Sequence, residues 1–368
     1  MSDAPLPKLA SIPPEVASAR DYEALAQERV ASGSWAYLAG GAGDERTSAR
    51  NRAAFDDLTL CTRLLRDMKG AHTRLELFGQ NLDHPLLLAP VANQLLAHPD
   101  GELATATAAA AMGATMVVST QANFALEEIA ATGVNWWFQL YIQPDRDFTA
   151  ALVRRAEAAG CKALVVTADA PVSGMRHREQ RAGFVMPPGV EAVNLRGMRS
   201  LRQEQAAPGA PPLLGSALLA AAPGWDDLRW LKSLTGLPVL LKGVMNADDA
   251  SLALGAGMDG LIVSNHGGRI LDGQPATIEM LPEIAQAVAG RAPLLFDGGI
   301  SRGADAFKAL ALGADAVLAG RAWLSGLAAA GAPGVAHVLH LLRAELELTM
   351  ALTGCRTLAE IEPALLRR

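Results

Sequence analysis

The residues most able to do chemistry stand at the ends of short apolar runs. The segment SNHGGR, residues 264–269, follows one run and places His266 where a histidine can act as a general base. Asp169 follows another run, and a carboxylate beside an imidazole favours its charged form. Arg176 and Arg269 could grip a carboxylate through paired donors. This set fits a substrate that carries a carboxylate and gives up a proton.

Two glycine turns form a candidate phosphate site. Asp297 precedes two glycines, Arg321 follows Gly320, and both turns come after apolar runs. Their backbone N–H groups can bind an anion, and the arginine adds a fork of donors. Lys242 ends the run LPVLLK, where a lysine could form a Schiff base, hold a fixed charge or make a structural ion pair. The turns therefore predict phosphate binding, and the role of the lysine stays open.

An internal repeat shows which elements position these residues. Four segments combine an Ala/Leu-rich helix end, a glycine, two residues and a continuous apolar run; the glycines are Gly113, Gly160, Gly257 and Gly313. A glycine at this place is typical of a helix C-terminus with positive φ, and a continuous apolar run is typical of a parallel strand buried on both faces. The repeat therefore predicts alternating helices and parallel strands.

The spacing of the repeat predicts a (β/α)₈ barrel. Further strands are expected at 86–89, 137–139, 239–242 and 294–297, which brings the total to eight. A doubly wound sheet is the competing architecture, and near-regular units favour closure. In a barrel the C-terminal strand ends meet at one rim, and a phosphate site commonly follows strands seven and eight. Residues 255–260 match G-x-G-x-x-G, but they precede a strand, so a dinucleotide fingerprint is rejected.

Three regions lie outside the repeating units. Residues 1–80 are predicted to form a helical cover segment that precedes the barrel, and residues 81–368 the barrel domain with its C-terminal helices. Residues 183–225, rich in Pro, Ala and Gly, form a long loop after the fourth strand. Residues 335–366 are expected to form one or two closing helices.

Composition excludes several classes of protein. The 368 residues carry 32 Lys and Arg against 38 Asp and Glu, a net charge of −6, so nucleic acid is not an expected partner. The three cysteines are far apart, and we expect neither a disulfide framework nor a metal site. The first residues do not resemble a signal peptide, and the apolar runs are too short to span a bilayer, so we expect a cytoplasmic protein without membrane attachment.

The chain resembles the FMN-dependent 2-hydroxy-acid oxidoreductases from about residue 22 to residue 361. The motifs that carry the resemblance are AYLAGGAGDE, FQLY, VLLKGV, SNHGGRILDG, FDGGISRG, KALALGADAVLAGR and ELELTMALTGC. The resemblance implies the barrel fold, FMN as the cofactor and oxidation of an (S)-2-hydroxy acid, lactate-like or larger, to the 2-oxo acid. It implies oxygen, a quinone or a cytochrome as the electron acceptor, and a homotetramer as the assembly.

The resemblance also implies roles for individual residues. His266 matches the base and Asp169 its partner, Arg176 and Arg269 match the carboxylate-binding arginines, and Tyr37 and Tyr141 match two active-site tyrosines. Lys242 would stabilise the reduced flavin. The implied cofactor-binding residues are Pro90, Val91, Ala92, Ser119, Gln139, Thr167, Lys242, Ser264, Asp297, Gly298, Gly299, Ile300, Ser301, Gly320 and Arg321.

Four positions depart from the family or vary within it. Ser301 stands where an arginine is usual, with Arg302 one place later, so the phosphate contact there would shift or use the backbone alone. Val91 replaces a common threonine, and Gln121 replaces the tryptophan of glycolate oxidase, which makes glycolate a weaker candidate substrate. Ala92 occupies a position that varies between alanine and glycine.

Several alternatives remain open. The base would take either the hydroxyl proton or the proton on C2. An FMN-dependent isomerase of the same barrel type would use flavin without net oxidation, although the base and the two arginines speak against it. A flavin-binding protein without catalysis would need no base at all.

Overall fold

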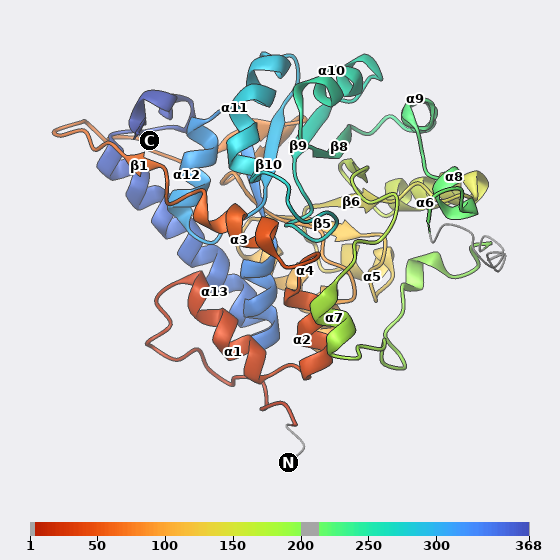
Figure 1. Ribbon diagram of the computed structural model, residues 1–368. Helices are drawn as coiled ribbons and strands as arrows, with labels where there is room; N and C mark the ends of the chain where they lie inside the picture. The colour runs from red at the N-terminus through yellow and green to blue at the C-terminus, as the bar shows by residue number, and fades with distance from the viewer. Residues whose placement is uncertain (1–3, 200–212, 368) are drawn as a thin grey trace.

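Eight parallel strands close into a barrel in the computed structural model, which describes residues 4–199 and 213–367. Neighbouring strands follow the order of the chain, and the last pairs with the first through Val317 and Leu86. The predicted (β/α)₈ architecture is therefore confirmed over the doubly wound sheet (Figure 1). The strands are β4 (Leu86–Leu88), β5 (Thr115–Ser119), β6 (Trp136–Leu140), β7 (Leu164–Thr167), β8 (Val239–Val244), β9 (Gly260–Val263), β10 (Leu294–Asp297) and β11 (Ala316–Ala319).

A main helix follows each barrel strand, and the repeat glycines end four of the helical segments. Gly113, Gly160, Gly257 and Gly313 all have positive φ, between 65° and 108°, as the repeat predicted. A side chain is strained in this conformation, which explains the residue type at the turn into each strand. The helices are α4 (Gly101–Ala111), α5 (Leu126–Ala130), α6 (Arg146–Ala158), α9 (Trp225–Leu234), α10 (Ala247–Gly255), α11 (Thr277–Val288), α12 (Gly303–Ala311) and α13 (Arg321–Thr353), with the short turn η2 (Gln94–Leu96) before α4.

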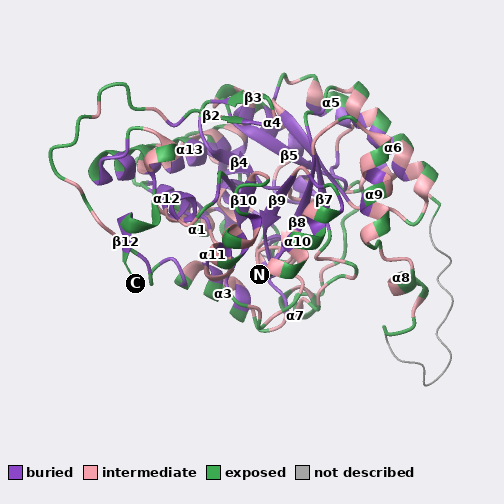
Figure 2. Ribbon diagram, turned by 90° about the horizontal axis from the view of Figure 1, so that it is seen from above, coloured by how far each residue is buried: buried purple, intermediate pink, exposed green. Residues whose placement is uncertain are grey.

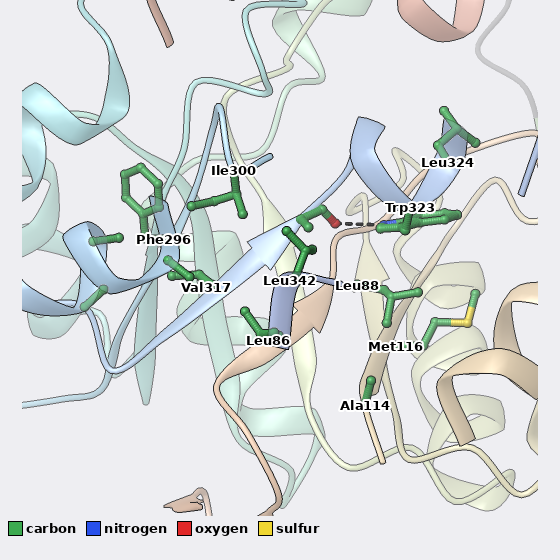
Figure 3. Close-up of a cluster of buried hydrophobic side chains, with 14 of the residues drawn as sticks. Leu86, Leu88, Ala114, Met116, Phe296, Ile300, Val317, Trp323, Leu324 and Leu342 are labelled. Carbon is green, nitrogen blue, oxygen red and sulfur yellow. Dashed lines mark hydrogen bonds between the residues drawn. The ribbon is translucent and has the colours of Figure 1, made fainter. Parts of the chain in front are cut away.

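The apolar core has two layers because successive strand residues point to opposite faces. Leu87 points into the barrel, whereas Leu86 and Leu88 point outward to the helices. In the outer layer the indole of Trp323 packs near Leu88 and donates a hydrogen bond of 2.7 Å to the carbonyl of Ala319 (Figure 3). The strands are buried on both faces, and the outer surfaces of the helices are exposed (Figure 2).

The C-terminal helical region has two parts, and the second part begins close to the start of the closing helix predicted for residues 335–366. Helix α13 starts at Arg321, directly after β11, and contains a break at Ala330 and Gly331. It is the one described helix that is long and apolar enough to cross a membrane, but 78% of its apolar window is buried inside the protein. After Thr353 the chain ends in short 3₁₀ turns and a strand, so the helical region predicted for residues 335–366 ends early. These elements are η4 (Leu358–Glu360), η5 (Pro363–Leu365) and β12 (Leu366–Arg367).

The first 80 residues are helical only in part, which corrects the prediction of a helical cover. Their first half contains η1 (Ala19–Asp21), α1 (Tyr22–Glu28), α2 (Ser32–Ala39) and α3 (Arg46–Ala53), and we call this segment, residues 19–53, the cover. α1 packs against α13 and α2 against α7 (Figure 1). Their second half contains β1 (Thr59–Leu60), which pairs with β12, and β2 (Leu75–Leu77), which forms a hairpin with β3 (Gln80–Leu82).

The β2–β3 hairpin seals the barrel interior. Leu77 and Leu82 join the inward-facing strand residues in one buried cluster, and the ring of Phe78 packs edge-on against Trp137 at 5.7 Å. Strands of three residues show too little alternation to be distinguished from other structure by pattern. The cover itself, residues 19–53, packs around the opposite, C-terminal end of the strands through Tyr37, which lines the cavity described below.

The predicted long loop lies between β7 and β8. Its described parts contain α7 (His177–Arg181), η3 (Val193–Leu195) and α8 (Ala217–Ala220). Residues 200–212 of the predicted loop lie outside the described residues. Leu195 and the segment 221–223 reach back to line the cavity, so the loop contributes to the same rim as the strand ends.

Candidate active site

One cavity of about 520 Å³ lies at the C-terminal ends of the barrel strands. Residues from all eight strand ends line it, together with the cover and the loop after β7. Every residue predicted for the site lines this cavity except Asp169 and Ser264, which lie one layer behind it. The predicted residues that line it are Tyr37, Pro90, Val91, Ala92, Ser119, Gln139, Tyr141, Thr167, Arg176, Lys242, His266, Arg269, Asp297, Gly298, Gly299, Ile300, Ser301, Gly320 and Arg321.

Buried polar side chains bridge the strand ends beneath the cavity. The Nε2 of Gln139 donates to the Oγ1 of Thr167 at 3.1 Å, and its Oε1 accepts from the hydroxyl of Ser119 at 3.3 Å. The three residues come from β6, β7 and β5, so the bonds run across neighbouring strands. A buried, hydrogen-bonded network of this kind holds polar groups in fixed directions toward a ligand.

Lys242 is buried with its own counter-charge. Its Nζ lies 2.8 Å from the Oδ2 of Asp297 and donates to the hydroxyl of Ser264 at 2.7 Å. Burial alone would lower the pKa of Lys242, but the charges of Asp297 and Asp169 outweigh it and raise that pKa. The ammonium is therefore a fixed positive charge. A Schiff base, which needs a neutral amine, is disfavoured by this environment.

His266 and Asp169 form the acid–base pair that the sequence predicted to be neighbours. The Nδ1 of His266 lies 2.9 Å from the Oδ1 of Asp169, and the imidazole lines the cavity. Burial tends to raise the pKa of Asp169, but the charge and hydrogen bond of His266, with Lys242, lower it overall. A carboxylate that stays charged orients the imidazole and stabilises it when it takes up a proton.

The loop that carries His266 is wound tightly against α3. His266, Gly267 and Gly268 all have positive φ, and a Cβ on Gly268 would come within 2.6 Å of the amide nitrogen of Ser48. Only glycine allows so close an approach of backbone to backbone. A buried amide pair, in which the Nδ2 of Asn51 donates to the Oδ1 of Asn265 at 2.8 Å, fastens the loop to the cover.

Two arginines that line the cavity lie close to the ring of Tyr37. The guanidinium carbon of Arg176 lies 5.2 Å from the centre of the tyrosine ring, and that of Arg269 lies 5.6 Å from it. Arg269 also donates to the carbonyls of Tyr37 at 2.9 Å and Gly40 at 2.5 Å. Burial and the nearby charge of Arg176 lower the pKa of Arg269. Arg176 has a carboxylate partner, Glu179, at 3.1 Å, whereas Arg269 makes no ion pair within the described residues.

The two tyrosines present hydroxyl groups to the same space. Burial, with the charge of Asp169, raises the pKa of Tyr141, so its phenol stays protonated and can donate. The hydroxyl of Tyr37 accepts a hydrogen bond of 2.9 Å from Asn93, and its ring stacks on Phe184 with centroids 5.0 Å apart. Asn93 and Phe184 were not predicted. Asn93 directly follows the predicted residues 90–92, and this position was the sequence signal that could have identified it. No sequence pattern indicates Phe184.

Arg321 lines the cavity together with the glycine turns, and it lies near Arg269, because both guanidinium groups donate to the carbonyl of Gly40. Arg321 opens α13 and donates to the carbonyls of Gly267 at 2.9 Å and Gly40 at 3.2 Å. Its Nε is buried and has no hydrogen-bond partner among the described residues. Burial, with the charges of Arg269 and Arg52, lowers the pKa of Arg321 to about 9. An anion bound here would supply the missing counter-charge.

These residues fit the phosphate of FMN. The backbone turns at Gly298 and Gly299, both with positive φ, face the cavity beside the N-terminus of α13. A Cβ on Gly299 would come within 2.2 Å of the carbonyl oxygen of Asn51, so the turn is pressed against the cover as well. A helix N-terminus, a glycine turn and a guanidinium without an anion together make a phosphate site.

The sequence and the fold match one family. Residues 26–368 match the model of the FMN-dependent dehydrogenase family. The chain belongs to this family. It is 52% identical over 355 residues to an L-lactate oxidase of Alicycliphilus denitrificans, covering 95% of this chain and 96% of the relative. It is 43% identical to the glycolate oxidase of Spinacia oleracea, covering 94% of each chain. A crystal structure of mandelate oxidase with benzoyl-formic acid superimposes with a TM-score of 0.86 at 41% identity, covering 95% and 98% of the two chains.

Membership in the FMN-dependent dehydrogenase family confirms several predictions together. The family, the barrel, the FMN cofactor and the oxidoreductase class are as the sequence indicated. FMN would be held by the residues of the strand ends and by the turns around Gly299 and Arg321. The roles given to individual side chains, including His266 and Arg269, stay predictions that the geometry supports.

The buried ion pair beneath the cavity leads to a prediction about stability. Replacing Lys242 by methionine should lower the free energy of unfolding of the flavin-free protein by about 3–5 kcal/mol, because Asp297 then stays buried without a counter-charge. The double variant Lys242→Met/Asp297→Asn should recover a large part of that loss. Urea unfolding followed by circular dichroism measures both values.

The matched control for Lys242 is Lys232, whose ion pair with Asp259 is about one-third exposed. Lys232→Met should cost no more than about 1 kcal/mol. Equal losses for the two lysine variants, or no recovery in the double variant, would show that Asp297 does not depend on Lys242.

Proposed function

We propose that the protein oxidises an (S)-2-hydroxy acid, lactate-like or larger, to the 2-oxo acid, with oxygen as the electron acceptor. The observation that carries the proposal is the pairing of His266 with Asp169 in a cavity that also holds Arg176 and Arg269. A base and a carboxylate clamp in one cavity suit a substrate with a hydroxyl group beside a carboxylate. Relatives named for L-lactate, glycolate and mandelate oxidation support this substrate class.

The charge of each side chain determines its proposed role in the reaction. Arg176 and Arg269 bind the substrate carboxylate, which fixes the position of C2 relative to the base, and such positioning can supply a large part of a rate. His266 takes the proton that leaves the substrate, and Asp169 stabilises the imidazolium that forms. Tyr141, which stays protonated, donates a hydrogen bond to a substrate oxygen. FMN, when bound, would supply the redox chemistry by accepting the two electrons and the second hydrogen that the hydroxy acid loses.

The cavity wall favours substrates larger than glycolate. Gln121, where glycolate oxidase has a tryptophan, lines the cavity together with Leu195 and residues 221–223 from the loop after β7. A shorter side chain at this position leaves room for a methyl or larger group on C2. Two alternative functions are an FMN-dependent isomerase, which would need no oxidant, and a flavin-binding protein without catalysis, which would need no base. The His266–Asp169 pair supports neither alternative.

The proposal also includes a cytoplasmic location and a homotetrameric assembly. A cytoplasmic location is supported by Cys61, Cys161 and Cys355, which are free thiols and fit a reducing compartment. The family resemblance supports a homotetramer as the assembly, and a quinone or cytochrome in place of oxygen is the alternative acceptor. Size-exclusion chromatography with light scattering measures the assembly.

The substrate class is tested by adding 2-hydroxy acids to the yellow protein without oxygen. Lactate and longer chains should bleach the flavin absorbance within seconds, (R)-lactate should not, and glycolate should act more slowly. Admitting air should then restore the colour if oxygen is the acceptor. A protein that none of the 2-hydroxy acids bleaches does not have the proposed function, and one that stays bleached in air uses another acceptor.

The base is tested separately by His266→Ala. The variant should keep FMN and its fold, but the rate of anaerobic bleaching by lactate should fall by about 10²–10⁴-fold, the range for loss of a general base. His340→Ala is the matched control, because His340 is exposed on α13 and does not line the cavity. Wild-type bleaching by the His266 variant would refute the role given to this residue.

A further inference from the structure

An arginine of the cover reaches the phosphate end of the cavity. Arg20, in η1, lines the cavity together with Ser301, which follows the glycine turn after β10. The Nε of Arg20 donates a hydrogen bond of 2.9 Å to the hydroxyl of Ser301, although the two residues are 281 positions apart. Neither the spacing nor the residue type of Arg20 marks it in the sequence.

The contact between Arg20 and Ser301 lies where this chain lacks a positive charge that the resembling family usually has. Ser301 stands where the resembling family usually has an arginine, and a phosphate monoester carries a charge of about −1.5 to −2 at neutral pH. Arg302 does not replace that arginine, since its guanidinium pairs with Glu345 of α13 at 3.3 Å and does not line the cavity. The cover therefore brings a guanidinium to a place where the barrel itself provides only a hydroxyl.

We propose that Arg20 binds the FMN phosphate in place of a side chain at position 301, and that the hydroxyl of Ser301 holds its guanidinium in position. The inference rests on FMN as the cofactor and does not depend on which 2-hydroxy acid is oxidised. Arg321 and Arg20 then contact the phosphate as two guanidinium groups, one from the barrel and one from the cover.

Arg20 is placed by the two residues that follow it in the chain, Asp21 and Tyr22. The carboxylate of Asp21 accepts hydrogen bonds from the amides of Ala17 at 2.9 Å and Ser18 at 2.8 Å, which fixes the turn. The hydroxyl of Tyr22, a fully buried residue, lies 2.8 Å from the Nδ1 of His337 on α13. The backbone on either side of Arg20 is therefore held before any ligand binds, which reduces the entropy lost on binding.

The neighbouring acidic groups already have donors. Asp305 accepts from the amide of Ser301 at 3.0 Å, from its hydroxyl at 3.2 Å and from the amide of Arg302 at 2.9 Å. Glu23 pairs with Arg52 at 2.9 Å. The bond to Ser301 uses only the Nε of Arg20, and within the described residues no hydrogen bond or ion pair engages its two terminal nitrogens. These two nitrogens are therefore available to donate hydrogen bonds to a phosphate.

The test compares FMN with riboflavin, which has the same ring and lacks the phosphate. Flavin-free protein is titrated with each, and the quenching of flavin fluorescence gives the Kd. Arg20→Ala should weaken FMN binding by about 10- to 100-fold, the range for hydrogen bonds to a charged group, and should leave the Kd of riboflavin unchanged. Arg20→Lys, which keeps the charge and loses the fork, should lose less.

Two further variants complete the design. Arg302→Ala is the matched control and should bind FMN as the wild type does, because Arg302 points to Glu345. Arg20→Ala/Ser301→Arg should recover much of the lost FMN affinity, because the guanidinium is then supplied from the barrel. Circular dichroism and the riboflavin Kd report whether each variant is folded.

Each outcome decides one point. Equal loss of FMN and riboflavin affinity in Arg20→Ala would mean that Arg20 stabilises the cover and does not bind phosphate, and unchanged FMN affinity would mean that it makes no contact; either result overturns the proposal. Loss of FMN affinity in Arg302→Ala alone would transfer the role to that residue. Failure of the wild type to bleach with 2-hydroxy acids, with the FMN-specific loss intact, would affect the proposed function and leave this inference standing.

Discussion

Positive charge desolvated at one rim of the barrel is the constraint on which the rest of the structure depends. Lys242 has Asp297 as a partner, but Arg269 and Arg321 donate to backbone carbonyls, and burial lowers the pKa of both. Desolvated charges that lack counter-ions lower the stability of the protein that holds them. An anionic cofactor and an anionic substrate relieve that cost, so this arrangement makes the cavity selective for ligands with negative charge.

The cover is what brings these charges together. Arg269 and Arg321 both donate to the carbonyl of Gly40 at the end of α2, and the amide of Ala42 donates to the carbonyl of Gly268 at 2.8 Å. The loop that carries His266 is thus held between the barrel and the cover. A barrel alone would position the residues at its strand ends, whereas Tyr37 and Arg20 reach the cavity only because the cover packs there.

The sequence predicted the parts of the molecule that repeat. Continuous apolar runs after Gly113, Gly160, Gly257 and Gly313 revealed the strands, and once the barrel was inferred its geometry placed His266, Lys242 and Arg321 at one rim. The β2–β3 hairpin was missed, because strands of three residues leave no readable period. The contacts of Arg20 with Ser301 and of Asn51 with Asn265 were missed for another reason. They join distant segments through side chains that carry no local pattern.

The central claim is that one rim binds the cofactor phosphate and the substrate carboxylate at separate groups of cations. A crystal structure of the protein with FMN and pyruvate, the 2-oxo acid formed from lactate, measures this directly. The phosphorus should lie near the N-terminus of α13, with phosphate oxygens within about 3 Å of the guanidinium nitrogens of Arg321, and the pyruvate carboxylate should contact Arg269 and Arg176. A phosphate bound to Arg269 and Arg176, or a flavin bound outside this cavity, would contradict the account.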